Sequence, residues 1–156
     1  MDNLKLKKQQ RSFLRLNRII VTVIFAFIII GTSISLMFSP VQLWQIALFE
    51  LGLIVFYSLI FIYQGAYYKH FSYAMDDFGL YINRGVFWRR KIIVPRNRVQ
   101  HTDVMQGPLE RRVKLAELIV HTAGTRNASV KLPGILHEEA EALRESLSFE
   151  ESNDAV

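Results

Sequence analysis

The sequence predicts a membrane-anchored α+β protein: a two-helix transmembrane hairpin, then a small antiparallel β-barrel or sandwich of six or seven strands closed by a C-terminal helix. Three observations predict this fold class. Two apolar blocks, 19–38 and 43–63, follow each other closely. Short segments in which apolar and polar residues alternate, separated by turn residues, fill 71–133. Apolar residues at helical spacing follow them. The expected divisions are a basic leader (1–18), the hairpin (19–68), a folded head (69–149) and a disordered acidic tail (150–156).

Each apolar block is long enough to cross a bilayer. Ile19 to Phe38 contains no charged residue, and Leu43 to Tyr63 contains only Glu50. A helix of about 20 residues spans a hydrocarbon core of about 30 Å. The first block is longer than the apolar core of a signal peptide, and no clear cleavage site follows it, so both blocks are predicted as retained spans.

The distribution of charge predicts the orientation of the hairpin. The leader holds six basic residues and one acidic residue, whereas the Ser39-Pro40 turn holds no basic residue. Positive charge is retained in the cytosol, so both termini are expected there. Residues 69–156 carry 13 basic and 12 acidic groups, so the net charge of +5 comes from the leader. A nearly neutral head does not support nucleic-acid binding.

Glu50 is the ionisable residue at membrane depth. A carboxylate there costs about 2.5–3.5 kcal/mol on insertion scales. Folding the hairpin brings Glu50 level with residues 29–33, where Gly31 permits close helix approach and Thr32 and Ser33 can donate hydrogen bonds. A polar contact between helices is the favoured interpretation, and a proton or substrate relay is the alternative.

Alternating residues predict the strands of the head. Phe71, Tyr73 and Met75 share one face of the first strand, and Leu80 and Ile82 point inward from the second. Further strands are predicted at 86–94, 98–106, 116–124 and 128–133, with a turn at 124–127 between the last two. The apolar stripe of the final helix consists of Leu136, Ala140, Leu143 and Leu147.

The chain resembles the bacterial pleckstrin-homology-like (PH-like), membrane-flanked, YdbS-like family over residues 15–150. The residues that carry the resemblance are MDDFGLYINRGVFWRRKIIVPRNRVQHTDVMQGPLERR, then LAELIVHTAG and LHEEAEALRESL. In that family the motif at 106–112 tends to be followed by an aromatic or aliphatic residue and Gly, where this chain has Val113 and Lys114.

The resemblance implies a PH-like fold, in which a strongly bent antiparallel sheet of about seven strands carries a capping helix. It also implies a non-enzymatic protein of the bacterial cytoplasmic membrane, beside a larger membrane protein with repeated PH-like domains. It does not imply phosphoinositide binding, because function does not follow from fold.

Two segments of the head are candidate binding sites for a protein partner or for anionic headgroups. The first is the basic cluster of Arg89, Arg90, Lys91, Arg96 and Arg98, in a region (69–136) with 12 basic and 5 acidic residues. The second is the loop formed by Gln106, Gly107, Pro108, Leu109, Glu110, Arg111 and Arg112, with Leu109 expected to anchor it inward. The structural alternatives are a solvated strand face and a loop that only shapes the bend.

No catalytic, metal or cofactor site is predicted. His101 and His121 lack a second ligand at helical or zinc-finger spacing, the chain has no cysteine, and no phosphate-binding or dinucleotide motif occurs. The sequence therefore predicts a cytosol-facing interaction module, anchored in the bilayer and able to self-associate through the hairpin. The alternative is an accessory subunit of an export or antimicrobial-peptide resistance system, in which Glu50 takes part in transport.

Overall fold

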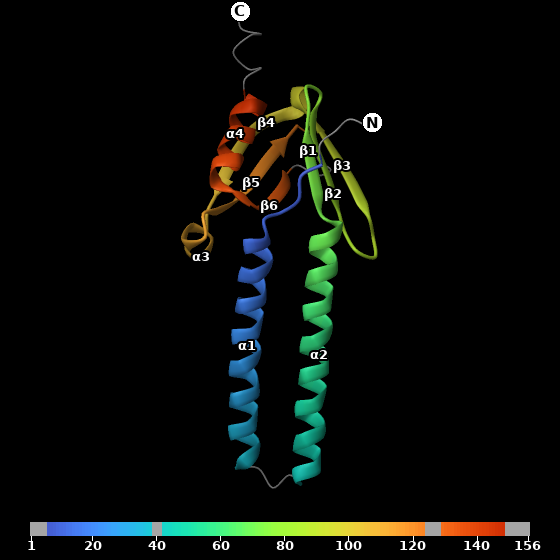
Figure 1. Ribbon diagram of the computed structural model, residues 1–156, viewed down its shortest axis with the longest axis vertical. Helices are drawn as coiled ribbons and strands as arrows, with labels where there is room; N and C mark the ends of the chain where they lie inside the picture. Colours follow the sequence, from blue (N-terminus) through green and yellow to red (C-terminus); the bar gives the residue numbers. More distant parts are fainter. Residues whose placement is uncertain (1–5, 39–41, 124–128, 149–156) are drawn as a thin grey trace, which may run out of the picture.

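The protein consists of a helical stalk and a folded head. A computed structural model describes residues 6–38, 42–123 and 129–148 of the 156. The elements are α1 (Arg11–Met37), α2 (Leu43–His70), β1 (Ser72–Met75), β2 (Gly79–Arg84), β3 (Arg90–Pro95), the 3₁₀ turn η1 (Arg96–Arg98), β4 (Val99–Met105), α3 (Pro108–Arg112), β5 (Leu115–Thr122), β6 (Ser129–Leu136) and α4 (His137–Ser148). Figure 1 shows α1 and α2 side by side, with the strands and α4 gathered at one end. The predicted turns at 39–40 and 124–127 and the tail at 150–156 lie outside the described residues.

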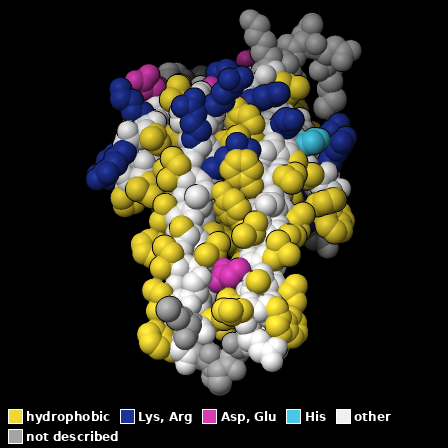
Figure 2. Space-filling model, turned by 60° about the horizontal axis from the view of Figure 1, so that its bottom comes forward, with side chains coloured by type: hydrophobic (Ala, Val, Ile, Leu, Met, Phe, Trp, Pro, Cys, Tyr) yellow, Lys and Arg dark blue, Asp and Glu magenta, His cyan; other side chains and the backbone are white. Residues whose placement is uncertain are grey.

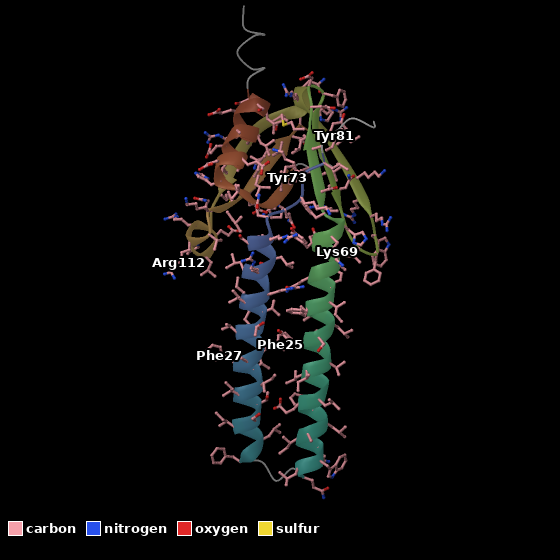
Figure 3. All side chains as sticks on the ribbon, in the orientation of Figure 1. Phe25, Phe27, Lys69, Tyr73, Tyr81 and Arg112 are labelled. Carbon is pink, nitrogen blue, oxygen red and sulfur yellow. The ribbon has the colours of Figure 1, made fainter. Side chains whose placement is uncertain are left out.

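Both stalk helices are long and apolar enough to cross a membrane. Each extends beyond its apolar block, because α1 begins inside the basic leader and α2 continues to His70. Phe25 points between the helices, 5.4 Å from the ring of Tyr57, whereas Phe27 points away and is 72 % exposed (Figure 3). So much exposed apolar side-chain surface on both helices is typical of a lipid-facing surface.

The head contains two three-stranded antiparallel sheets, ordered β1-β2-β3 and β4-β5-β6. Of the predicted alternatives, the closed barrel and the seventh strand are wrong for the described residues, which form six strands in two sheets. Pro95 ends β3 because it cannot donate to a ladder, and η1 then carries the chain into the second sheet. At the free edge of β1, where another strand could pair, Lys7 of the leader makes one isolated bridge with Tyr73.

The core lies between the two sheets and α4. The predicted inward positions of β2 are confirmed, since Leu80 and Ile82 are buried; on the predicted face of β1, Tyr73 is buried and Met75 is partly buried against the core. The apolar stripe of α4 is confirmed at Ala140, Leu143 and Leu147, which pack in the same core. Leu136 is an exception, because it belongs to β6 and is 39 % exposed.

The leader is joined to the head by backbone and charge contacts that its sequence did not indicate. Lys7 and Tyr73 exchange two backbone hydrogen bonds, of 2.8 and 2.9 Å. The Lys7 ammonium lies 2.6 Å from a Glu139 carboxylate oxygen on α4. Burial, together with a hydrogen bond to Glu139, raises the pKa of the Tyr73 hydroxyl. The leader, β1 and α4 therefore meet at one polar cluster.

A second set of contacts joins the start of α1 to β6. The backbone N–H of Gln10 donates to the Gly134 carbonyl at 2.8 Å, and the buried Gln9 side chain donates to the Pro133 carbonyl at 2.9 Å. Phe13 lies directly against Gly134, leaving no room for a Cβ atom there. The head is thus attached to the stalk twice, through these contacts and through the direct connection of α2 to β1.

Candidate membrane-contact site

The β2–β3 hairpin reaches back from the head along the stalk. β1 leads away from the end of α2 and β2 returns antiparallel to it, so the hairpin tip (residues 85–89) lies beside α2 (Figure 1). The ring of Phe87 stacks on that of Tyr63, with centroids 6.4 Å apart and planes at 14°. Tyr63 precedes the end of α2 by seven residues, or about 10 Å along the helix. The tip therefore lies level with the last two turns of α2.

The tip presents two large aromatic side chains to the outside. Phe87 is 79 % exposed and Trp88 is 83 % exposed. The predicted strand at 86–94 begins only at Arg90, so the prediction that Phe87 and Trp88 belong to it is wrong. The chain turns at Gly85, whose φ of +110° and contact with the Trp88 carbonyl exclude other residues.

The structure divides the predicted basic cluster between the two ends of β3. Arg89, Arg90 and Lys91 are exposed at or beside the tip. Arg96 and Arg98 follow the other end of β3, roughly 20 Å away at 3.3 Å per residue. There the Arg96 guanidinium donates to the Asp76 carbonyl at 3.2 Å and so joins the β1–β2 turn. Only the first three basic residues share the position of the aromatic tip.

The predicted loop at 106–112 folds as a short capped helix. Gln106 donates to the Leu115 carbonyl at 2.7 Å, and the Glu110 carboxylate accepts the Gly107 N–H at 2.9 Å, with Pro108 at the first helical position. The expected inward anchor is wrong, because Leu109 is 48 % exposed. Gln106 and Glu110 therefore shape the turn.

Basic side chains of the head gather where it meets the stalk. Arg111 and Arg112 are exposed on α3, and Figure 3 places Arg112 at the base of the head, across the stalk from Lys69. Figure 2 shows Lys and Arg side chains around the junction of stalk and head, next to the hydrophobic surface of the helices. The exposed aromatic tip and this basic surface thus lie at the same end of the stalk.

Lys114 adopts the left-handed backbone conformation, with φ of +55°. This is the position where the family resemblance leads one to expect Gly, which adopts the conformation without strain. We expect Lys114→Gly to stabilise the head by about 1 kcal/mol in urea unfolding of the detergent-solubilised protein. Lys131→Gly, on β6, serves as the control and should destabilise. A loss of stability in Lys114→Gly would contradict this backbone assignment.

The predicted position of Glu50 in the stalk is confirmed. The hydroxyls of Thr32 and Ser33 each donate to the same Glu50 oxygen, Oε1, at 3.0 Å. The other oxygen, Oε2, is buried and has no hydrogen-bond partner among the residues that the structure describes. Gly31 does not mediate the contact between α1 and α2, because a Cβ atom there would meet nothing within 4 Å.

Comparisons with known proteins agree with this architecture. A family model described as "Bacterial PH domain" matches residues 15–150. The transmembrane protein YdbS of Bacillus subtilis (strain 168) is 32 % identical over 138 residues, which cover 86 % of this chain and 83 % of that protein. No solved structure matches. Two helices of membrane-spanning length, a head that the family model covers and a transmembrane relative lead to one conclusion: the chain is a membrane protein that belongs to the bacterial PH domain family, with YdbS as a relative.

Proposed function

We propose that this protein is a non-enzymatic, membrane-tethered PH-like module whose head faces the cytosol and binds the anionic headgroups of its own membrane. One observation carries the proposal: the exposed Phe87 and Trp88 stand level with the end of a membrane-spanning helix, where the Phe87 ring lies against that of Tyr63. Tryptophan, whose indole carries a polar N–H, favours this interfacial depth.

The charges around the tip suit an anionic surface. Arg89, Arg90 and Lys91 are exposed beside the aromatics, and each basic residue near such a surface gains about 1 kcal/mol. Because α1 and α2 already hold the head at the bilayer, the contact needs little further loss of translational freedom. A weak surface contact is therefore enough to hold the tip at the headgroups.

The cytosolic orientation rests on the basic leader and on the basic residues at the base of the head. Positive charge flanking a span is retained on the cytosolic side. For a bacterial protein we therefore expect the cytoplasmic membrane as the location, with both termini inside the cell.

Self-association, or pairing with a larger membrane protein that carries repeated PH-like domains, is part of the proposal. Gly31 and Gly52 leave open space on α1 and α2, where the helix of another subunit could approach closely. The second candidate function, an accessory role in export or antimicrobial-peptide resistance, is favoured by the Glu50 oxygen at membrane depth for which the described part of the chain offers no partner. Substitution of Glu50 separates the two functions.

The headgroup contact is tested by the depth of Trp88 in lipid nanodiscs. Trp44→Phe leaves Trp88 as the sole tryptophan, since the chain has two. With phosphatidylglycerol present, we expect a nitroxide at a shallow acyl position to quench the emission of Trp88 strongly. Reversal of Arg89, Arg90 and Lys91 to Glu should reduce this quenching, because the tip is then repelled by the anionic surface.

A matched control places the probe at the far end of the same hairpin. Phe78 in the β1–β2 turn is 60 % exposed, so Phe78→Trp combined with Trp44→Phe and Trp88→Phe should report an unquenched tryptophan. If Trp88 were no more quenched than this control in anionic bilayers, headgroup binding by the tip would be refuted. Shielding of Trp88 only after addition of cell membranes would instead point to a protein partner.

A further inference from the structure

Two histidines that are 20 residues apart in the sequence lie face to face in the second sheet. His101 on β4 and His121 on β5 are directly opposite in the strand register. Their rings stack with centroids 4.1 Å apart and planes at 12°. This pairing cannot be recognised from residue spacing, because it arises from the register of β4 against β5.

A carboxylate completes the cluster. Asp103 follows His101 by two residues and so points to the same face of β4. Its Oδ2 lies 3.2 Å from His121 Nε2, and one donor atom from each of the three residues lies within 4.8 Å of the others. His101 and Asp103 are exposed and the His121 side chain is 30 % exposed, so solvent and ions reach the cluster.

We propose that His101, Asp103 and His121 form a binding site for a divalent transition-metal ion such as Zn²⁺. Two imidazoles and one carboxylate are ligands that Zn²⁺ and Cu²⁺ take readily, whereas Mg²⁺ and Ca²⁺ prefer all-oxygen sites. At metal–ligand distances of 2.0–2.1 Å, a tetrahedral site needs donor atoms roughly 3.4 Å apart. Because the donor atoms now lie within 4.8 Å of one another, binding requires side-chain rotation that brings them to this separation and tilts the stacked rings so that their lone pairs converge.

Three protein ligands leave a fourth position open on a tetrahedral ion. The open position faces solvent on the outer side of β4 and β5, and it takes a water molecule or a side chain from a partner. The ion would also link two neighbouring strands of the head. This inference is independent of the headgroup contact, because the tip belongs to the other sheet.

The test is calorimetric titration with ZnCl₂ of the full-length protein in detergent, purified through a tag without histidine. We expect saturable binding of one ion per chain, and a higher melting temperature of the head with Zn²⁺. His101→Ala and His121→Ala should each weaken binding at least about tenfold, and Asp103→Asn should weaken it less. His70→Ala is the matched control, because His70 is also exposed but lies at the end of α2, and it should leave binding unchanged.

X-ray absorption at the zinc edge gives a second reading. The expected spectrum contains two imidazoles among nitrogen and oxygen ligands at about 2.0–2.1 Å. The inference is overturned if no saturable binding is measured with circular dichroism confirming the fold. It is equally overturned if His101→Ala and His121→Ala bind as the wild type does, or if His70→Ala loses binding to the same extent.

Discussion

Gly134→Ala should destabilise the head by about 2–5 kcal/mol, a large part of the total stability of a small domain. Gly134 has a φ of +74°, which costs an alanine about 1–2 kcal/mol. Its new Cβ atom would also lie 2.5 and 2.7 Å from ring carbons of Phe13, and such overpacking adds about 1–3 kcal/mol. The substitution therefore acts on the joint between α1 and β6.

A double-mutant cycle with Phe13→Ala separates these two causes. Removing the Phe13 ring relieves the two closest contacts but leaves the backbone strain and a 2.9 Å contact with the Cβ atom of residue 13, so Gly134→Ala in that background should cost less than in the wild type, and at least about 1–2 kcal/mol. Gly52→Ala is the control, since its Cβ would meet nothing within 4 Å and the head should be unaffected. Urea unfolding in detergent measures all four variants. An equal cost of Gly134→Ala with and without Phe13 would show that α1 does not pack against β6.

This joint matters for the proposed membrane contact. One connection between α2 and β1 would leave the head free to swivel, whereas a second attachment through Gln10 and Gly134 fixes its direction relative to the stalk. The hairpin tip then meets the bilayer without a conformational search. Gly134→Ala is therefore also expected to weaken the quenching of Trp88.

The parts of the fold that separate apolar from polar surroundings could be predicted from the sequence. The stalk helices can be recognised in the sequence because a helix that spans lipid needs a long run of uncharged residues. Leu80 and Ile82 were placed correctly because one face of β2 is buried and the other is not, which imposes a period of two. The position of Glu50 opposite Thr32 could be predicted from the geometry of a helical hairpin alone.

The remaining features depend on contacts that produce no periodic pattern in the amino-acid sequence. Lys7 and Gln10 attach to the head largely through backbone groups, which any residue type except proline supplies. Phe87 and Trp88 are typical strand residues, and only the turn at Gly85 exposes them. Pairing of His101 with His121 requires the strand register, which the sequence does not state.

Glu50→Leu should stabilise the stalk by about 1–2 kcal/mol if the carboxylate serves only to pack the two helices. Removing it relieves an insertion cost of about 2.5–3.5 kcal/mol, and the two lost interhelical hydrogen bonds contribute about 0.6 kcal/mol each. Loss of Glu50 does not leave the Thr32 hydroxyl without an acceptor, because the Ile28 carbonyl lies 2.8 Å away and accepts its proton instead. Even with its hydrogen bonds, the Glu50 carboxylate is therefore expected to lower the stability of the isolated hairpin.

Unfolding of the full chain by sodium dodecyl sulfate in bicelles measures this effect, with Thr32→Val as the matched change on the other helix. Thr32→Val should cost about 0.6 kcal/mol, because Ser33 still donates to Glu50. Destabilisation by Glu50→Leu would show that Glu50 Oε2, which has no partner among the described residues, has one in the intact assembly. Loss of crosslinked oligomers in the same variant would identify that partner as another subunit. A more stable, normally assembled Glu50→Leu protein that no longer supports the cellular phenotype would instead favour a transport role over helix packing.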